Sequence, residues 1–584
     1  MPVVNATVAM IFEEIAELLD VQGANPFRIR AYRNAARTVS ELGTDIKTLM
    51  ASGTDLTEIP GVGKDLAGKI LEIVNTGKCQ VLEGLRKEVP LAVTELLRIP
   101  GLGPKRVKIL WRDLNIQTLD QLLRAAKDGR IHELPGFGEK TEQRILEAAL
   151  AHLGESRRFK LSVAAQYGEH LVEHLRKASG VKRIEITGSY RRMKETVGDL
   201  DIVIAASAYT SVMEHLTHYE EVKDIISKGT TRATVILKSG IQVDVRVVPE
   251  KSYGSALLYF TGSKLHNIAI RRIAQDKGLK INEYGVFKGR RHIAGETEES
   301  VYEAIGLSWI PPELREDRGE IEAASAGKLP ILVERSDLKG DLHAHSKASD
   351  GRNTIEEMAL AAKACGLRYM AITDHSKRLT VARGLDSVRL VKQIAEVERI
   401  NKTLSGITIL AGIEVDILDD GTLDLPDSVL VKLDIVVAAV HSKFDLPRAR
   451  QTERILKALD NPFVSILAHP TGRLIDEREP YDVDMQRVIR KTKACGVALE
   501  VNAHPQRLDL LDIYCQMAKE EGARVAINSD AHNTFELDGL RFGVGQARRG
   551  WLEKQDVLNT RSLKELRVLL RRTSKQALVG MLSS

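Results

Sequence analysis

Seven short apolar runs between residues 340 and 532, separated by helical patterns, constrain the fold of this chain more than any other feature. Strands that alternate with helices pair in parallel, because each helix returns the chain to the same end of the sheet. In a parallel α/β barrel, the functional groups lie on loops at the carboxyl ends of the strands. The runs therefore predict a distorted, seven-stranded barrel in this part of the chain.

Residues that can bind metal ions stand at or just after the ends of these runs. The nine candidate ligands are His343, His345, Asp350, His375, Glu414, His441, His469, Asp530 and His532. A single histidine at a strand end is usually structural, but ligands at the ends of six of the seven runs favour one shared site. Imidazole together with carboxylate suits Zn²⁺, Mn²⁺ or Fe²⁺. Nine ligands are too many for one ion, so we expect two or three ions and metal-dependent phosphoester hydrolysis.

A second feature with chemical meaning lies nearer the middle of the chain. Gly188 and Ser189 follow a short apolar segment, and Asp199 and Asp201 open the next one. The backbone N–H groups of such a turn can hold a phosphate, and Arg192 adds a planar set of donors. Strand residues two apart point to the same face, so the two carboxylates would lie side by side and bind a hard cation.

Asp244, inside the apolar segment 243–248, supplies a third carboxylate. With Asp199 and Asp201 it completes the triad that two-metal phosphoryl or nucleotidyl transfer needs. An exposed acidic strand without a function would explain neither the spacing of the carboxylates nor the turn before them. The region 161–250 is therefore predicted to hold a site for phosphoryl or nucleotidyl transfer that uses Mg²⁺ or Mn²⁺.

One short pattern occurs three times in the N-terminal region: an apolar residue and a proline, followed by two glycines one residue apart. Each copy follows an apolar helix end and precedes a helical pattern. A single copy could be a structural turn, but three copies favour helix-hairpin-helix units that hold DNA phosphates without reading the sequence. The glycines that would approach the DNA are Gly61, Gly63, Gly101, Gly103, Gly136 and Gly138.

The composition is that of a globular protein, with 43% hydrophobic and 28% charged residues. A chain of 584 residues predicts about three to five domains. No apolar run is long enough to cross a membrane, and the acidic N-terminal segment is not a secretory signal. The four cysteines form no CxxC pair, so we expect a cytoplasmic protein that does not act at a membrane. The net charge of +5 does not by itself indicate nucleic-acid binding.

The N-terminal hairpins and their surroundings resemble the lyase and fingers region of family X DNA polymerases. Within this resemblance, Lys69 matches the Schiff-base lysine of the deoxyribose-phosphate lyase, and Tyr32 matches a tyrosine of that site. Asp65 stands where the animal repair enzymes carry a second active-site lysine. A Schiff-base amine must be partly deprotonated, whereas an acid one helical turn away favours the charged form. This departure argues against lyase activity.

The central region resembles the palm and thumb of the same family. Asn267 would reach the minor-groove edge of the incoming base, and Arg271 the templating side, where acceptors common to every base pair report pair geometry. Val197 stands where the animal enzymes have a serine, so we expect one phosphate hydrogen bond to be absent. The resemblance implies that the nucleotide is bound by Gly188, Ser189, Arg192, Gly198, Tyr259, Phe260, Gly262, Asn267 and Arg271.

Residues 337–575 resemble the polymerase-and-histidinol-phosphatase (PHP) domain. The nine candidate ligands fill all nine ligand positions of that family, which implies an active phosphoesterase. His504 lies outside this set, and we expect it to be a loop residue. Lys443 and Arg507, near the predicted rim, are candidates for holding a substrate phosphate.

Together, these features resemble a bacterial family X DNA polymerase with a C-terminal PHP domain. The predicted fold is multidomain, with an α-helical N-terminal region, an α+β palm and thumb, and an α/β barrel of seven strands. The predicted domains are a helix-hairpin-helix lyase-like domain (1–85), a fingers-like DNA-binding region (86–160), the palm (161–250), the thumb (251–318), a linker (319–336) and the PHP domain (337–575).

The resemblance implies a DNA-directed DNA polymerase that fills short gaps in base excision repair, with 3′-5′ exonuclease and abasic-site cleavage in the PHP domain. Its substrates would be gapped or primer–template DNA and deoxynucleoside triphosphates, and we expect a monomer. Three alternatives stay open. The PHP domain could be a small-molecule phosphatase, the chain could be a repair scaffold with a weak polymerase, or it could be a template-free nucleotidyltransferase. The hairpins argue against the first, the aspartate triad against the second, and Asn267 with Arg271 against the third.

Overall fold

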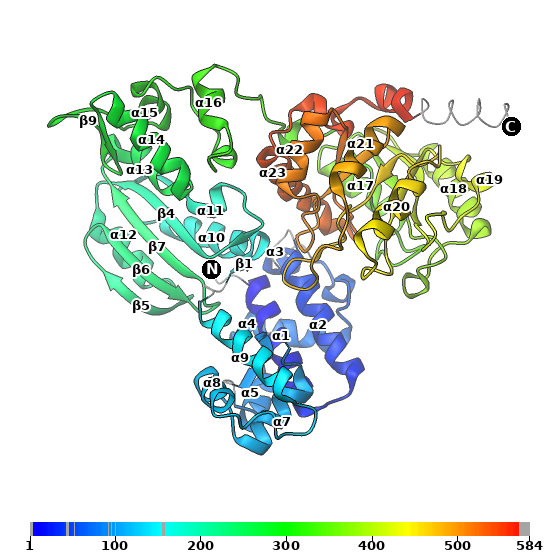
Figure 1. The fold of residues 1–584 in the computed structure, drawn as a ribbon, viewed down its shortest axis with the longest axis horizontal. Coiled ribbons are helices and arrows are strands. Elements are labelled where there is room, and N and C mark those ends of the chain that lie inside the picture. Colours follow the sequence, from blue (N-terminus) through cyan, green and yellow to red (C-terminus); the bar gives the residue numbers. More distant parts are fainter. Residues whose placement is uncertain are drawn as a thin grey trace.

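The computed structural model describes residues 4–42, 46–51, 53–90, 93–94, 96–99, 101–154 and 158–570. Figure 1 shows a helical N-terminal region, a central sheet with its thumb, and a C-terminal barrel. This arrangement confirms the predicted fold class. Pro100 of the second glycine pattern and residues 571–575 of the predicted PHP domain lie outside the described residues. Within those residues, no helix is both long and apolar enough to cross a bilayer.

The N-terminal region is a bundle of helices with its own apolar core, in which Phe12, Ile70 and Leu110 are fully buried. Helices α4 and α7 begin directly after Gly63 and Gly103, which cap them without a side-chain hydrogen bond. Their first N–H groups are therefore left for an external acceptor. The helices are α1 (Val4–Gln22), α2 (Pro26–Glu41), α3 (Ile46–Ala51), α4 (Lys64–Thr76), α5 (Gln80–Glu88), α7 (Pro104–Leu114), α8 (Leu119–Lys127) and α9 (Glu139–Gly154).

The central sheet has five strands in the order β2-β4-β7-β6-β5, with β4 and β7 parallel at its centre. Helices α10 (Leu161–Leu175) and α12 (Tyr209–Thr217) pack on one face, and α13 (Tyr253–Thr261) packs on the other. The strands are β2 (Val181–Ile186), β4 (Asp199–Ala206), β5 (Val222–Lys228), β6 (Arg232–Leu237) and β7 (Gln242–Val248). A short pair, β1 (Phe159–Lys160) with β3 (Thr196–Val197), and helix α11 (Gly188–Arg191) precede β4.

The thumb follows the central sheet and continues into the segment that joins it to the barrel. Glu320, on helix α16 (Glu320–Ser325), is buried and lies 2.6 Å from Nδ1 of His266. The joining segment is therefore packed against the thumb. The thumb elements are α13, α14 (Lys264–Asp276), β8 (Lys280–Asn282), β9 (Gly285–Lys288), β10 (Arg291–Ala294) and α15 (Glu298–Ala304).

The C-terminal barrel has seven parallel strands that follow one another in chain order. A parallel bridge between Ala344 and Ala531 brings its first and last strands together. The strands are β11 (Gly340–Asp341), β12 (Tyr369–Ile372), β13 (Thr408–Asp416), β14 (Ile435–Ala439), β15 (Ile466–Leu467), β16 (Ala498–Asn502) and β17 (Val525–Asn528). The helices between and after them are α17 (Ile355–Ala364), α18 (Ser387–Asn401), α19 (Asp427–Leu430), α20 (Arg448–Ala458), α21 (Met485–Cys495), α22 (Asp512–Glu521) and α23 (Leu540–Arg549).

The barrel and the central sheet share part of one apolar core. Ile475, Leu508 and Phe542 of the barrel are buried in the same cluster as the residues of the sheet. At the edge of this contact, Arg473 is paired with Glu195 at 2.7 Å. The barrel and the central sheet are thus packed against each other through buried side chains.

Two candidate metal-dependent active sites

The first site is formed by carboxylates on the two central strands of the sheet. In the parallel register, Asp201 on β4 lies opposite Asp244 on β7. Asp199 is two residues before Asp201, so the sequence pattern and the strand pairing bring all three together. Burial, followed by the charges of Asp199 and Asp244, raises the pKa of Asp201 to about 7. This mutual repulsion is what a bound divalent cation would relieve.

Asp244 differs from the other two carboxylates because neighbours already satisfy it. Its oxygens accept hydrogen bonds from Thr234 Oγ1 (2.6 Å), Gln242 Nε2 (2.7 Å) and Arg232 (3.2 Å). Burial acts to raise the pKa of Asp244, but these bonds hold it below its usual range. The structure therefore keeps Asp244 ionised and oriented beside the more strongly perturbed Asp201.

The turn at Gly188 is built against the Asp201 side chain. Gly188 has φ of +64°, and a Cβ there would lie 2.8 Å from Oδ2 of Asp201. The Thr187 backbone N–H and hydroxyl both donate to the Asp201 carbonyl, at 2.7 and 3.1 Å. Ser189 is the next residue of the turn, and Gly198 directly precedes β4. Only glycine allows this close approach of the predicted phosphate turn to the carboxylate.

Two arginines after the turn connect it to the thumb. Arg191 forms a two-pronged ion pair with Glu298 at 2.7 and 2.9 Å. Arg192 donates its Nε to Glu316 (2.9 Å) and its Nη1 to the carbonyl of Thr261 (2.7 Å). The guanidinium of Arg192 is thus held at the site, while its contact with a triphosphate stays a prediction.

The predicted nucleotide-binding residues of the thumb lie together on α13 and α14. The rings of Tyr259 and Phe260 meet edge to face at 5.1 Å. Asn267 donates to the carbonyls of Tyr259 (2.7 Å) and Gly262 (3.1 Å), and Arg271 donates to the carbonyl of Asn267 (3.1 Å). Both amide donors of Asn267 are therefore used by the backbone, and the predicted contact with a base edge requires its side chain to rotate.

In the N-terminal region, Lys69 and Asp65 form the ion pair that their spacing on α4 predicts. The Tyr32 hydroxyl is buried, and burial raises its pKa. Asp65 thus places a carboxylate beside the amine that would have to attack a sugar aldehyde.

We expect Asp65→Ala to increase Schiff-base formation at Lys69, because the substitution removes the partner of the ammonium group. Asp65 is exposed, so the gain should be about two- to fivefold, the range of exposed ion pairs. Borohydride trapping on an incised abasic duplex measures it, with Lys69→Ala as the variant in which trapping must vanish. Equal trapping by the wild type and Asp65→Ala would show that the pair does not limit this chemistry.

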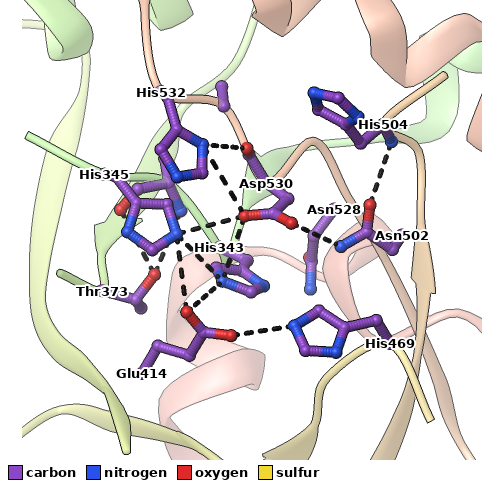
Figure 2. Close-up of polar contacts among 12 residues, drawn as sticks. His343, His345, Thr373, Glu414, His469, Asn502, His504, Asn528, Asp530 and His532 are labelled. Atoms are coloured by element: carbon purple, nitrogen blue, oxygen red, sulfur yellow. Dashed lines mark hydrogen bonds and ion pairs between the residues drawn. The ribbon is translucent and has the colours of Figure 1, made fainter. Parts of the chain in front are cut away.

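The second site lies at the carboxyl ends of the barrel strands (Figure 2). Three sets of possible ligand atoms each lie within 4.8 Å of one another, and two of the sets share His345. His469 reaches the same centre, with its Nε2 3.0 Å from Glu414. Such sets, sharing ligands, suit two or three neighbouring ions. The sets are His345, Asp350, His375 and His532; His343, His345 and Asp530; and His375, Glu414 and His441.

The charges of this site are strongly coupled. Burial opposes protonation of His375, but Glu414 and Asp350 outweigh it and raise the pKa of His375 to about 10. His345, by contrast, has its pKa lowered to about 4 by burial and by its neighbours His532 and His375. Metal ions binding here would displace protons from the raised histidines. The left-handed φ of +55° at Asp530 is the kind of backbone strain that gathers at functional sites.

Sequence reasoning missed the carboxylates that support the ligands from behind. Glu500 is fully buried, lies 2.8 Å from Nδ1 of His343 and accepts the His469 backbone N–H at 2.8 Å. Asp416 lies 3.2 Å from Nδ1 of His441 in the same way. The signal for both was a carboxylate within an otherwise apolar strand. Such partners orient a ligating imidazole and raise its basicity.

We expect Glu500→Gln to weaken metal binding by the barrel about 10- to 100-fold, because His343 loses the charged partner that orients it. The side chain keeps its size, so the fold should be retained. Titration with Mn²⁺ or Zn²⁺, followed by calorimetry, measures the change. Glu479→Gln, at an exposed position, is the matched control, and equal affinities of the two variants would contradict the role of Glu500.

The remaining sequence candidates lie at the rim. His504 belongs to none of the three ligand sets among the described residues, and its backbone N–H donates to Asn502 Oδ1 at 3.0 Å (Figure 2). Arg507 Nε lies 3.6 Å from Oδ2 of Asp530. Lys443 has a left-handed φ of +58°. Phosphate binding by Lys443 and Arg507 stays a prediction.

Sites of both kinds in one chain define a class of enzyme that joins nucleotidyl transfer to phosphoester hydrolysis, and the hairpins direct both to DNA. Family models match five parts of the chain. They match as a helix-hairpin-helix domain (4–79), a SAM-like helix-hairpin-helix tandem (93–149), a DNA polymerase beta palm (162–266), a DNA polymerase beta thumb (256–316) and a PHP domain (341–504).

Comparison with curated proteins extends the similarity over the whole chain. The chain is 40% identical over 569 residues to the DNA polymerase/3′-5′ exonuclease PolX of Bacillus subtilis (strain 168), covering 96% of this chain and 98% of that protein. A probable phosphatase of Thermoanaerobacter sp. (strain X514) is 31% identical over 231 residues, 38% of this chain and 89% of the relative. The chain belongs to the family X DNA polymerases that carry a C-terminal PHP domain.

Proposed function

We propose that the protein is a DNA-directed DNA polymerase that fills short gaps, and that its PHP domain removes nucleotides from the 3′ end. The observation that carries this proposal is the pairing of Asp201 with Asp244 across parallel strands, beside the Gly188 turn. The eight ligands of the three sets, together with His469 beside Glu414, support the second activity. The similarity to a polymerase/exonuclease over nearly the full length supports both.

In the polymerase site, Asp199, Asp201 and Asp244 would hold Mg²⁺ or Mn²⁺. When bound, these ions lower the barrier to attack by the primer 3′ hydroxyl and neutralise the leaving pyrophosphate. Asp201 lies between the Gly188 turn and Asp244, so its carboxylate would be shared by the two proposed ion positions. Gly188 and Ser189 would offer backbone N–H groups to the triphosphate, with Arg192 beside them.

In the barrel, the nine ligands would hold two or three ions, which we propose to be Mn²⁺, Zn²⁺ or Fe²⁺. When bound, such ions supply a hydroxide nucleophile at neutral pH and polarise the phosphodiester. Glu500 and Asp416 orient His343 and His441. Arg507 would approach the scissile phosphate from the rim. Cleavage at abasic sites uses the same chemistry, and we include it in the proposal.

DNA would be held by the hairpins through phosphate contacts, so we propose gapped or primer–template DNA as the substrate and a monomer as the working form. Gly63 and Gly103 leave the N-termini of α4 and α7 open for these contacts. The role in base excision repair follows from gap filling. It does not depend on lyase activity, which the Lys69–Asp65 pair disfavours.

A second candidate for the PHP domain is hydrolysis of small phosphate monoesters, because a probable phosphatase is similar to 231 residues of this chain, 38% of its length. One experiment separates the two. The protein is incubated with a 5′-phosphorylated one-nucleotide gap, Mg²⁺ or Mn²⁺ and deoxynucleotides, and in parallel without deoxynucleotides. Extension in the first tube and 3′ shortening in the second support the proposal. Hydrolysis of p-nitrophenyl phosphate without any shortening of DNA would replace the exonuclease by a phosphatase.

A further inference from the structure

Helix α23, the last helix of the barrel before the 3₁₀ turns, lies against the loop that follows the phosphate turn of the palm. A Cβ at Gly545 would lie 3.0 and 3.1 Å from Cβ and Cγ of Met193, and closer still to its Cε. Met193 itself has a left-handed φ of +54°. A bulkier residue than glycine at 545 would displace Met193, the neighbour of Arg192. The position of this loop therefore depends on a helix of the other module.

Arg549, at the end of α23, adds hydrogen bonds from a charged group to this contact between the modules. Its Nη1 donates both to the carbonyl of Arg192 (2.8 Å) and to Oε1 of Glu316 (2.9 Å). Its Nη2 donates to Asp512 within the barrel, at 2.6 Å. The Arg549 side chain is only 5% exposed, so these bonds are shielded from solvent. They are charge-assisted and hence among the stronger hydrogen bonds in proteins.

Glu316 accepts hydrogen bonds both from Arg549 and from Arg192 of the polymerase site. The oxygen that accepts from Arg549 also accepts from Nε of Arg192, at 2.9 Å. Lys194 Nζ lies further away, at 3.9 Å. Burial acts to raise the pKa of Glu316, but Arg192 and Arg549 hold it below its usual range. The single negative charge of Glu316 is therefore shared mainly between two guanidinium groups.

The hydrogen bonds of Arg192 leave one of its two terminal nitrogens available for a ligand. Its Nε and Nη1 are bound to Glu316 and to the Thr261 carbonyl, whereas Nη2 has no hydrogen-bond partner among the described residues. If Arg549 were absent, Glu316 would be neutralised mainly by Arg192, with Lys194 further away at 3.9 Å, and the positive charge that Arg192 offers to an anionic ligand would fall. Arg549 instead supplies a second positive charge from outside the site.

We propose that Arg549 of the PHP barrel is a positioning residue of the polymerase site, which holds Glu316 and the Arg192 backbone so that Arg192 can bind the triphosphate. The PHP barrel would then contribute to nucleotide affinity separately from its own metal chemistry. This inference rests on the proposed polymerase function. The contact of Arg549 with Arg192 and Glu316 joins the barrel to the palm, and neither metal site needs it to bind its own ions.

Steady-state gap filling with the full-length protein tests the proposal. Arg549→Ala should raise KM for the deoxynucleotide about tenfold with a smaller change in kcat, the size expected for losing a hydrogen bond to a charged group. Arg549→Lys should recover part of the affinity. The double variant Arg549→Ala/Glu316→Gln should return KM toward the wild-type value, because the competing carboxylate is gone. Arg541→Ala is the matched control, since Arg541 also connects α23 to the palm, through Glu169 at 2.9 Å.

A merely structural role predicts a different pattern. The double variant would then be as impaired as Arg549→Ala or worse, or Arg541→Ala would raise KM equally, and either result would overturn the proposal. If Arg549→Ala does not fold, as shown by its melting temperature, Arg549→Lys and Glu316→Gln decide the matter. Arg549→Lys must raise KM relative to the wild type, and Glu316→Gln must not. Calorimetric binding of Mg²⁺–deoxynucleotide ranks the nucleotide affinities of the same variants without turnover. Failure of the wild type to fill gaps would therefore reject the proposed function separately from the role of Arg549.

Discussion

Asp201→Ala is expected to abolish gap filling while 3′ shortening of the same DNA continues at the wild-type rate. Asp201 lies between the Gly188 turn and Asp244, so its removal deprives both proposed metal positions of a shared carboxylate. Losing several kcal/mol of charge stabilisation corresponds to about a thousandfold or more in kcat. Primer extension on a gapped duplex, with product lengths resolved on a denaturing gel, measures both activities at once.

Asp224→Ala provides the matched control for this prediction. Asp224 is an exposed carboxylate on β5 of the same sheet, and its loss should leave extension unchanged. Extension by Asp201→Ala at more than a few per cent of the wild-type rate would remove Asp201 from the proposed metal site. Loss of both extension and shortening would mean that the two sites are coupled or that the variant is misfolded, which circular dichroism distinguishes.

His343→Ala is expected to have the opposite effect and to abolish 3′ shortening while gap filling continues. His343 is fully buried, approaches Glu414 and Asp530 at 3.5 Å and is oriented by Glu500. A barrel without it should lose one of its ions, with a fall in hydrolysis of about a thousandfold or more. Metal content by mass spectrometry and shortening of a 3′-labelled primer are the two measurements.

The reciprocal behaviour of Asp201→Ala is the internal control for His343→Ala. The expectation would be wrong if His343→Ala shortened primers normally, because the exonuclease would then lie outside the barrel. A chelator titration adds a test of metal dependence. Dialysis against EDTA should remove both activities, and Mg²⁺ or Mn²⁺ should restore extension. If shortening returns with Zn²⁺ or Fe²⁺ but not with Mg²⁺, the two sites differ in the ions that they use.

The proposed function depends on two metal centres with opposing chemistry in one chain. The shared core of Ile475, Leu508 and Phe542 with the central sheet shows that these centres are held in one packed unit. Arg549 and Gly545 extend this contact to the loop that carries Arg192. We therefore expect that a substitution in the barrel can change nucleotide affinity without touching a metal ligand. Kinetic comparison of PHP-domain variants should include the polymerase reaction for this reason.

Local patterns were enough to predict the candidate ligands that the structure brings together at each site. The runs that end in His375, Glu414 and His441 predicted strands whose carboxyl ends meet. Strands that alternate with helices pair in parallel, and the structure has this order. Asp199 and Asp201 were predicted to share a face by the two-residue period of a strand. These signals depend on neighbours within a few residues. They could therefore be read from the sequence alone, and the structure agrees with the barrel and with the register of Asp201 and Asp244.

The sequence by itself determined the class of fold and the types of side chain at each site, because periodicity and strand ends are properties of the local backbone. Only the tertiary structure decided which residues stand behind the ligands. Glu500 reaches His343 across 157 residues of sequence, and Arg549 reaches Arg192 across 357. No local pattern encodes such pairs, since they arise when separately folded segments pack and their buried charges must find partners. The candidate ligands could therefore be read from local patterns, whereas their supports and the contact between the two modules could not.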